Sequence, residues 1–289
     1  MKSILLMPVK NEEWIIESTL GYMHSLFDNI IISDQNSSDG TLEIIKNFSN
    51  ITYLNNSRKI HSNIVRWELL ENSRKLFGKN NLIACIDADE LIPKKLYLNQ
   101  RKRILKQPPG TVFYSQWIQL WRSINQYRND DSVWSPKKNI KEYMFIDNEN
   151  IDYEKIETIN DHTSRVPNMG IKKRFKLNFP LLHLQFVNWE RSQLKQAWYM
   201  CNEKVVGLES EVINAKYFNS QNEDNIYLSK TKKKWLKDFF VDDNALKLER
   251  YSEWYVSEIN KLFSLHGVDM FLDLNIWNLE KIKELKLSY

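Results

Sequence analysis

Short apolar runs alternate with amphipathic segments through about the first 93 residues of the chain. The runs that predict strands are residues 4–7, 29–33, 51–54 and 82–86. The segments that predict helices are residues 14–26, 41–47 and 64–77. Apolar strands that alternate with helices are typical of a parallel sheet covered on both faces. The pattern therefore predicts an α/β fold in this part of the chain.

The rest of the chain is less regular. A Pro-Pro-Gly break precedes residues 111–120, which alternate like a strand. Residues 123–180 are polar, aromatic and poorly periodic, which indicates a loop-rich region with short strands. We expect a further strand at 181–187, then a helix capped by Asn188, and a mostly helical tail from about residue 209.

The composition is that of an ordinary globular protein. The 289 residues are 42% hydrophobic and 27% charged, enough for one or two domains with their own core. A formal net charge of +4 is too small to indicate a nucleic-acid partner, although it suits ligands that carry phosphate. Cys85 and Cys201 lie far apart and form no CxxC pair, so we expect both to be reduced core residues.

Neither a secretion signal nor a membrane span is expected. The apolar start at residues 4–7 is too short for a signal core, and no apolar run approaches the roughly 18 residues that span a bilayer. We therefore expect a cytoplasmic protein. The motifs GxGxxG and GxxxxGK[ST] do not occur either, which argues against a dehydrogenase and a P-loop enzyme.

Acidic residues gather at the predicted strand ends. In an open parallel sheet, ligands bind beyond the carboxyl ends of the strands. Glu12 follows the first strand, Asp34 the second, and Asp87 and Asp89 the fourth. Carboxylates held close together need a cation or a ligand rich in donors. A nucleoside supplies donors, and oxygen ligands suit magnesium or manganese shared with substrate phosphates.

Each of these elements has an ordinary explanation when it is taken alone. Asp87-x-Asp89 is common in solvated turns, and Asp39-Gly40-Thr41 is a common helix start. Their joint occurrence, each directly after a predicted strand, favours a site for a nucleotide and a metal.

The same segments resemble glycosyltransferase family 2 enzymes with the GT-A fold. The likeness rests on residues 7–12 (MPVKNE), 33–41 (SDQNSSDGT) and 86–90 (IDADE), in this order and at these separations. It covers roughly the first third of the chain and does not specify a sugar. It implies a Rossmann-like nucleotide-diphospho-sugar transferase fold, with a mostly parallel central sheet and a helical C-terminal region. Many relatives carry two acids where this chain has Asp34-Gln35, which leaves Gln35 a neutral role or none.

The resemblance also implies roles for individual residues. Asp89 would bind the metal, and Asp87 would lie near the ribose and the metal. The residues assigned to the nucleotide sugar are Pro8, Val9, Asn11, Glu12, Asp34, Asp39, Arg66, Asp87, Ala88 and Lys195. Arg66 lies where the family often has an arginine near the donor, and an exposed helical arginine is the alternative.

A second likeness lies further along the chain. Residues 183–191 (HLQFVNWER), with Lys195, resemble a block of bacterial surface-polysaccharide glycosyltransferases. Enzymes with the GT-A fold often add a late histidine to the metal shell and a cation to the diphosphate. His183 and Lys195 are the candidates for these roles. A structural histidine on a strand is the alternative for His183.

Residues 161–167 (DHTSRVP) lie where such enzymes build the acceptor side. An inverting transfer needs a general base for the acceptor hydroxyl. Asp161 and His162 are the candidate catalytic residues, although Thr163 stands where some relatives have an acid. Arg165 pairs either with phosphate or with a neighbouring acid.

Two features with aromatic residues have two explanations each. Trp117 and Trp121, near a predicted strand end, either stack on an acceptor sugar or pack in the core. Residues 230–240 combine several lysines with Trp235 and Phe239. Such a stretch either contacts an anionic membrane surface or begins a solvated helix in which Trp235 and Phe239 are buried.

These features predict a metal-dependent glycosyltransferase. It would move a sugar, with inversion, from a nucleotide-diphosphate donor to the hydroxyl of a glycan or lipid-linked acceptor in cell-surface polysaccharide synthesis. The expected cofactor is manganese or magnesium. The expected location is the cytoplasm, with peripheral contact at the inner membrane face.

The expected domains are a GT-A domain at residues 1–208 and a helical extension at 209–289. The first divides into a nucleotide-binding half (1–107) and an acceptor half (108–208). One alternative is a nucleotidyltransferase of the same fold, but the chain has no glycine-rich phosphate loop after its first strand. The other is a non-catalytic carbohydrate-binding protein, which the intact Asp87 and Asp89 disfavour.

Overall fold

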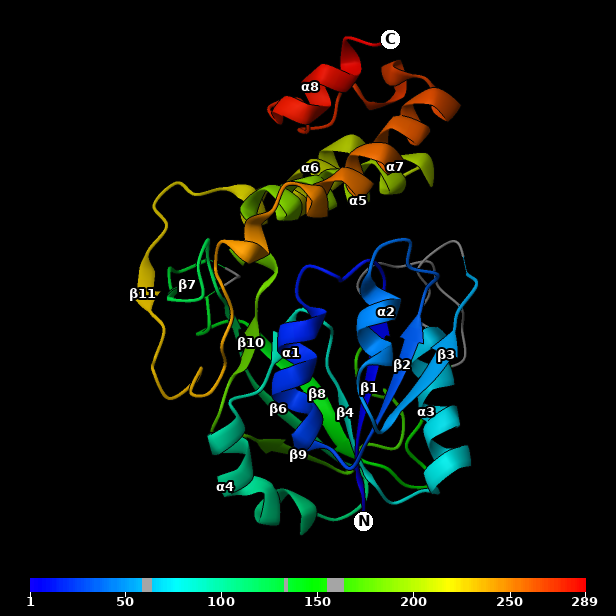
Figure 1. Cartoon of the computed structure of the whole chain (residues 1–289), viewed down its shortest axis with the longest axis vertical. Helices are drawn as coiled ribbons and strands as arrows, with labels where there is room; N and C mark the ends of the chain where they lie inside the picture. The colour runs from blue at the N-terminus through cyan, green and yellow to red at the C-terminus, as the bar shows by residue number, and fades with distance from the viewer. Residues whose placement is uncertain (59–63, 133–134, 155–163) are drawn as a thin grey trace. The chain divides into compact units, whose positions relative to one another are not determined.

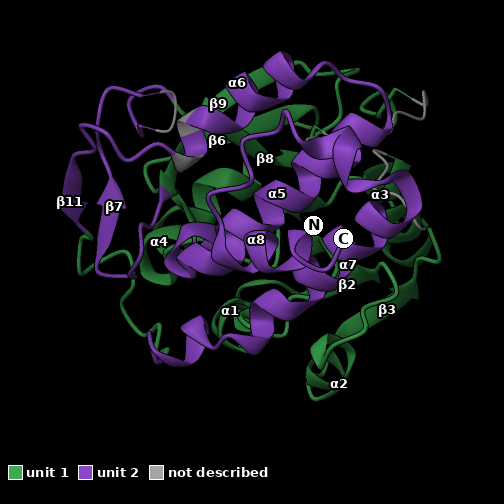
Figure 2. Ribbon diagram, turned by 90° about the horizontal axis from the view of Figure 1, so that it is seen from above, with its two compact units in different colours: residues 1–118, 139–183, 231–241 green, residues 119–138, 184–230, 242–289 purple. Residues whose placement is uncertain are grey.

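The computed structural model describes residues 1–58, 64–132, 135–154 and 164–289. The chain forms two compact units, coloured separately in Figure 2. Unit 1 consists of residues 1–118, 139–183 and 231–241, and unit 2 of residues 119–138, 184–230 and 242–289. Each unit is described by itself below.

Four parallel strands form one side of the sheet in unit 1 (Figure 1). In chain order they are β1 (Ser3–Val9), β2 (Asn29–Asp34), β3 (Ile51–Asn55) and β4 (Leu82–Cys85). Their order in the sheet is β3-β2-β1-β4, and all three pairings are parallel. All four strands predicted from the apolar runs are confirmed.

Helices connect these strands as the periodicity predicts. They are α1 (Ile16–Met23) with η1 (His24–Leu26), α2 (Thr41–Lys46) and α3 (Ile64–Phe77). The apolar face of α3 packs on the sheet through Val65, Leu69 and Leu70, which share a buried cluster with Ile4 and Ile31. Figure 1 shows α1 on the near side of the sheet. The burial of β1, β2 and β4 explains why their apolar runs are continuous rather than alternating.

The sheet continues past β4 with mostly antiparallel strands. They are β5 (Glu90–Leu91), β6 (Thr111–Gln119), β8 (Ile140–Ile146), β9 (Lys173–Lys176) and β10 (Leu181–His183), and α4 (Lys94–Leu105) follows β5. In the described residues the sheet has nine strands in the order β3-β2-β1-β4-β8-β6-β10-β5, with β9 paired to β6. The predicted fold class, α/β with a central, mostly parallel sheet, is confirmed. The strand expected at 181–187 is shorter than predicted, because the chain turns into η2 (Gln185–Val187) after His183.

Unit 2 is mainly helical. A small antiparallel sheet pairs β7 (Gln126–Arg128) with β11 (Leu228–Lys230). Its helices are α5 (Trp189–Val205), α6 (Ser210–Gln221), η3 (Ala245–Lys247), α7 (Arg250–His266), η4 (Val268–Phe271) and α8 (Glu280–Lys286). Leu194, Ile213, Ile259 and Phe263 belong to its buried core.

The predicted cap of α5 is confirmed, since Asn188 Oδ1 accepts a hydrogen bond from the Arg191 backbone N–H at 3.0 Å. The tail from residue 209 contains the predicted helices α6, α7 and α8, whereas residues 222–244 form no helix. No helix among the described residues has both the length and the apolar character needed to cross a membrane.

Residues 231–241, which include all but the first residue of the lysine-rich stretch 230–240, belong to unit 1 and form no helix. The expected helix start is therefore wrong, whereas the expected burial of Trp235 and Phe239 is confirmed. It forms turns in which Trp235 N–H donates to Lys232 O and Phe239 N–H donates to Leu236 O. Trp235 and Phe239 are buried, and Phe239 packs edge-on against Tyr22. These two aromatic residues fasten the segment to the unit.

Candidate active site

The loops after β1 and β2 are tied to each other at the carboxyl edge of the sheet. Val9 and Asp34 are register partners, so the two strands end level. Asn11 has a left-handed backbone, with φ of 52°, which asparagine tolerates better than most residues. Its backbone N–H donates to Ser37 Oγ at 2.9 Å, and its Oδ1 accepts from the Ser38 N–H at 2.8 Å. The two motif segments therefore form one structural element.

Asp34 ends β2 and is 1% exposed. Its carboxylate accepts from Ser37 Oγ at 2.5 Å and from the Tyr53 hydroxyl at 3.3 Å. Burial and the nearby Asp34 carboxylate raise the pKa of Tyr53, which keeps that hydroxyl protonated as a donor. Glu12, at the end of the neighbouring loop, is buried and accepts from Trp14 Nε1 at 2.6 Å. Asp34 and Glu12 are thus oriented by hydrogen bonds.

Other predicted residues of this edge have backbone or packing contacts. Asp39 accepts from the Glu13 N–H at 3.1 Å and the Thr41 N–H at 3.0 Å, which fixes the start of α2. Pro8 is half-buried and Val9 is buried in β1. Ala88 is buried, and its carbonyl accepts from Thr19 Oγ1 at 2.6 Å. Their roles toward a nucleotide stay predictions.

Asp87 lies between two arginines. Arg66 Nη2 is 2.5 Å from Asp87 Oδ1, and Arg165 Nη2 is 2.8 Å from Asp87 Oδ2. Burial alone would raise the pKa of Asp87, but Arg165 and then Arg66 outweigh it and lower the pKa to about 2. Asp87 is therefore fully ionised at neutral pH.

Arg66 is a buried residue of α3, not an exposed helical arginine. It is 6% exposed, and its Nε and Nη1 atoms are buried without a hydrogen-bond partner among the described residues. Unpaired buried donors cost free energy, and they are typical of a position where a ligand supplies acceptors.

Glu90 organises the same cluster, and the sequence analysis gave it no role. It is fully buried, and its Oε1 accepts from Trp117 Nε1 at 2.7 Å. Its Oε2 accepts from the Asp87 N–H at 3.1 Å and forms an ion pair with Arg165. Arg165 thus bridges two acids, in agreement with the second explanation for this residue. The sequence signal for a role of Glu90 is its position immediately after the Asp87-x-Asp89 pair.

His183 and Asp89 lie side by side. His183 Nε2 is 3.4 Å from Asp89 Oδ2, and both side chains are buried. His183 is the register partner of Glu90 in the β10–β5 pair, and this pairing places His183 near the end of β4. Its ring stacks on Trp117, with centroids 4.6 Å apart and planes 21° apart.

One carboxylate oxygen and one imidazole nitrogen are suitable ligands for a divalent ion. The described residues contain no group of three or more His, Cys, Asp or Glu that could hold a metal by itself. An ion at Asp89 and His183 would need substrate oxygens or water for its remaining positions, as in sites that share the metal with phosphates.

The remaining predicted residues are Lys195, Asp161, His162, Trp117 and Trp121. Lys195 lies on α5 in unit 2. Asp161 and His162 lie outside the described residues. Trp117 (8% exposed, unit 1) and Trp121 (0% exposed, unit 2) are both buried, which agrees with the packing explanation. Trp117 packs against His183 and Glu90 of the site.

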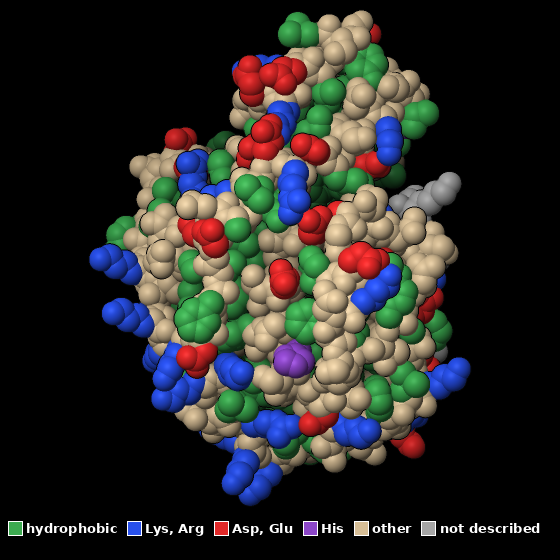
Figure 3. Space-filling view, viewed as in Figure 1, with side chains coloured by type: hydrophobic (Ala, Val, Ile, Leu, Met, Phe, Trp, Pro, Cys, Tyr) green, Lys and Arg blue, Asp and Glu red, His purple; other side chains and the backbone are tan. Residues whose placement is uncertain are grey.

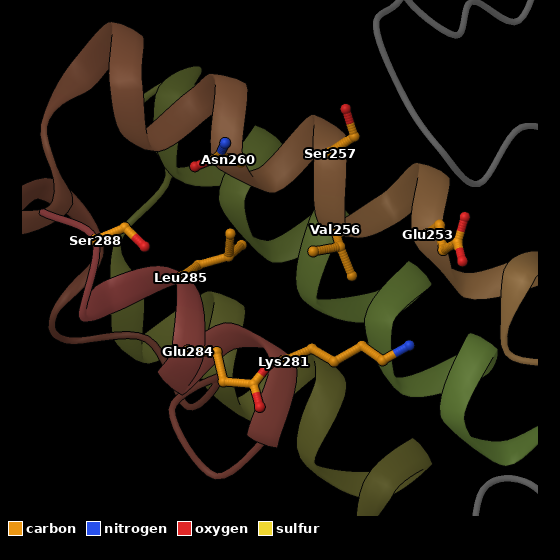
Figure 4. Close-up of a pocket in the computed structure, with 8 residues that line it drawn as sticks. All are labelled: Glu253, Val256, Ser257, Asn260, Lys281, Glu284, Leu285 and Ser288. Atoms are coloured by element: carbon orange, nitrogen blue, oxygen red, sulfur yellow. The ribbon is translucent and has the colours of Figure 1, made fainter.

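A shallow depression of about 500 Å³ occurs in unit 2, between α7 and α8 (Figure 4). It is lined by Glu253, Val256, Ser257, Asn260, Lys281, Glu284, Leu285 and Ser288. Lys281 forms ion pairs with Glu190 and Glu249, both at 2.9 Å. The lining mixes carboxylate, amide, hydroxyl and aliphatic groups and includes no residue of the sequence motifs. We therefore place the candidate site at the sheet edge of unit 1.

The sequence profile of one family, glycosyl transferase family 2, matches residues 4–155 of the chain. The chain belongs to this family. The match covers β1 to β8 and therefore includes the strand-end residues described above. The family resemblance inferred from the sequence motifs is confirmed.

Solved structures give partial overlaps with this family 2 chain. Glucosyl-3-phosphoglycerate synthase from Mycobacterium tuberculosis, solved with Mn2+, UDP and glucosyl-3-phosphoglycerate, is 20% identical with a TM-score of 0.29. The overlap covers 41% of this chain and 44% of that one, less than half of the mycobacterial enzyme.

A second overlap is with 4-diphosphocytidyl-2C-methyl-D-erythritol synthase, 11% identical over 50% of this chain and 75% of that one, with a TM-score of 0.33. Overlaps this partial carry no argument about the activity of the chain. Comparison with curated proteins gives no match.

Proposed function

We propose that the chain is a glycosyltransferase that moves a sugar from a nucleotide-diphosphate donor to an acceptor hydroxyl. The observation that carries the proposal is the convergence of Asp34, Asp87 and Asp89 at one sheet edge, with His183 against Asp89. Family 2 membership supports the same reaction class. Ligands of open parallel sheets bind at this edge.

The nucleotide binds over the loops after β1 and β2. Asp34 and Glu12 accept hydrogen bonds from the base and ribose, and their orientation is supported by Ser37 and Trp14. The remaining proposed residues of this surface are Pro8, Val9, Asn11, Asp39 and Ala88. The Nε and Nη1 groups of Arg66, which have no hydrogen-bond partner among the described residues, bind oxygens of the nucleotide sugar beside Asp87.

Asp89 and His183 hold a divalent metal, manganese or magnesium. A metal bound there supplies positive charge for the leaving diphosphate. Asp87 is kept ionised by its two arginines and stays fixed beside the ribose. Lys195, on α5 of unit 2, stays a prediction for a further cation at the diphosphate.

The transfer proceeds with inversion, because one attack by the acceptor hydroxyl replaces the leaving diphosphate. Asp161 or His162 takes the proton of that hydroxyl as general base. The acceptor is a glycan or a lipid-linked glycan of a surface polysaccharide. The transferase domain extends to about residue 208, followed by a helical extension.

The protein contacts the inner membrane face through residues 231–241. Lys232, Lys233, Lys234 and Lys237 are exposed on this segment. Phe240 is 86% exposed next to the buried Phe239. Lys and Arg side chains stand out along the margin of the molecule where this segment runs (Figures 1 and 3). Cations with an exposed aromatic residue suit an anionic lipid surface.

The test is a panel of nucleotide-diphosphate sugars screened for thermal stabilisation in the presence and absence of manganese. A ligand that binds only the folded state raises the unfolding temperature. We expect at least one sugar nucleotide to stabilise the wild type with manganese and none to stabilise Asp89→Asn. The matched control is Glu43→Gln, since Glu43 is 75% exposed on α2. Equal stabilisation of wild type and Asp89→Asn, or of neither by any donor, contradicts the proposal.

A further inference from the structure

The cations of the site differ in the ion pairs that they form. Asp87 pairs with Arg66 and Arg165, and Glu90 pairs with Arg165. Asp89, the third carboxylate of the cluster, lies against His183. Lys141 forms no ion pair with any carboxylate that the structure describes, although it lies at the same edge.

Lys141 faces the site because of its register in the sheet. It lies on β8 opposite Ser115 of β6, and alternate residues of neighbouring strands share one face. Its Nζ is 4.3 Å from the centroid of the Trp117 ring, and Arg165 Cζ is 5.4 Å from the same centroid. Two cations therefore meet at one indole, whose N–H is bonded to Glu90.

The surroundings of Lys141 do not favour its charge. Burial lowers the pKa of the Lys141 ammonium, and the neighbouring Arg165 lowers it further, while Glu90 and Asp87 offset only part of this effect. A desolvated cation beside a second cation is costly unless an anion approaches. Such an arrangement is typical of a position completed by a ligand.

We propose that Lys141, with Trp117 and Arg165, forms a subsite for an anionic group of a substrate, a phosphate or a carboxylate. The inference rests on the proposed function and names the chemistry that this side of the site accepts. The anion has two possible sources, the diphosphate of the donor and an acid group of the acceptor. Lys141 binds it by a charge-assisted hydrogen bond from the ammonium.

The test compares Lys141→Met, which keeps an aliphatic stem on Trp117 but removes the charge, with Lys141→Arg, which keeps a charge. The control is Lys176→Gln, which removes an exposed lysine on β9. Calorimetry measures the binding of UDP and UMP with manganese, and of inorganic phosphate to the free protein and to the protein saturated with UDP and manganese. GDP and GMP replace the uridine nucleotides if the wild type prefers them.

If the anion is the donor diphosphate, Lys141→Met weakens the diphosphate about tenfold and the monophosphate much less. If it is an acid group of the acceptor, nucleotide affinity is unchanged and phosphate binding to the saturated protein falls about tenfold. Lys141→Arg retains the affinity in either case. Equal binding of every probe by Lys141→Met and Lys176→Gln overturns the inference.

Failure of the proposed function is distinguishable from failure of this inference. A wild type that binds no nucleoside diphosphate with manganese contradicts the proposed function. The phosphate titration of the free protein still reports on Lys141, and its loss in Lys141→Met alone supports the anion subsite.

Discussion

The imidazole Nε2 of His183 lies 3.4 Å from the carboxylate Oδ2 of Asp89, although the two residues are far apart in the sequence. The antiparallel pairing of β10 with β5 sets this approach, since His183 is the partner of Glu90. Because strand pairing holds Asp89 and His183 in place, the two side chains need little rearrangement to bind one cation. Metal ligands require such rigid support.

We therefore expect both residues to be needed for manganese binding. Asp89→Asn abolishes detectable binding, and His183→Ala weakens it by at least about tenfold, because one of two protein ligands is lost. Titration followed by manganese electron paramagnetic resonance measures the affinity. His266→Ala, at an exposed position, is the control. Unchanged manganese affinity in His183→Ala would mean that this histidine only packs on Trp117.

Asp34 is expected to anchor the nucleoside. Asp34→Asn keeps the size of the side chain but removes the buried charge that Ser37 and Tyr53 orient. Nucleoside diphosphate binding should weaken by about 1–3 kcal/mol. Calorimetry at constant manganese measures the change, with Glu43→Gln as the control. An affinity equal to that of the control argues that the base is held elsewhere.

Asp87 is expected to make the free energy of unfolding depend on pH in the acid range. Its pKa falls from 3.8 to about 2 in the folded chain, where Arg165 and Arg66 outweigh its burial. A lowered pKa contributes stability above about pH 4, and this contribution disappears as the pH falls toward 2. The contribution is about 2 kcal/mol.

Urea unfolding of wild type and Asp87→Asn between pH 5 and pH 2 measures this effect. The stability difference between the two proteins should shrink as the pH falls through this window. A difference that stays constant with pH would show that the two arginines do not hold the Asp87 charge in solution.

Arg74 of α3 offers a matched pair of ion-pair deletions. It contacts the buried Asp147 with an N–O distance of 2.7 Å and the 43%-exposed Glu71 at 2.8 Å. Asp147→Ala removes the buried partner of Arg74 and leaves it with Glu71 and Asp152, the latter at 3.6 Å, and should lower the free energy of unfolding by about 2–3 kcal/mol. Glu71→Ala should cost less than about 1 kcal/mol. Denaturant unfolding of both variants checks the ranking, and equal losses would contradict it.

The segment at residues 231–241 is expected to bind anionic lipid weakly and in a salt-sensitive way. Each lysine near an anionic surface contributes about 1 kcal/mol. A variant with Lys232, Lys233, Lys234 and Lys237 changed to Gln should lose co-sedimentation with phosphatidylserine vesicles at low salt, where the wild type binds. Wild-type binding should vanish at high salt, because salt screens exposed charges. Equal sedimentation of both proteins would refute membrane contact by this segment.

The parallel half of the fold was predictable because its strands lie under helices. Continuous apolar runs such as 29–33 and the periodicity of 64–77 report burial directly, and they match β2 and α3 closely. The antiparallel half was not predictable to the same degree. β8 begins with exposed and half-buried residues and ends with Tyr143 to Ile146 buried on both faces, so it shows neither alternation nor a clean apolar run.

The site divides in the same way. Asp34, Asp87 and Asp89 follow strands, so their gathering at one edge follows from parallel topology alone. Glu90 and Lys141 come together only through the pairing of β6, β8 and β10, which no local pattern records. His183 was assigned through family resemblance, and its place beside Asp89 depends on the same long-range pairing.

Trp117 stacks on His183 and donates its indole N–H to Glu90, so one ring touches both the histidine of the candidate metal site and the acid that holds Arg165. Indole emission is sensitive to ring contacts and to the polarity around the N–H. Trp117 fluorescence therefore reports on the site. The chain has 10 tryptophans, and the difference between the emission spectra of wild type and Trp117→Phe isolates the signal of Trp117. Occupation of either side of the site becomes visible without a label.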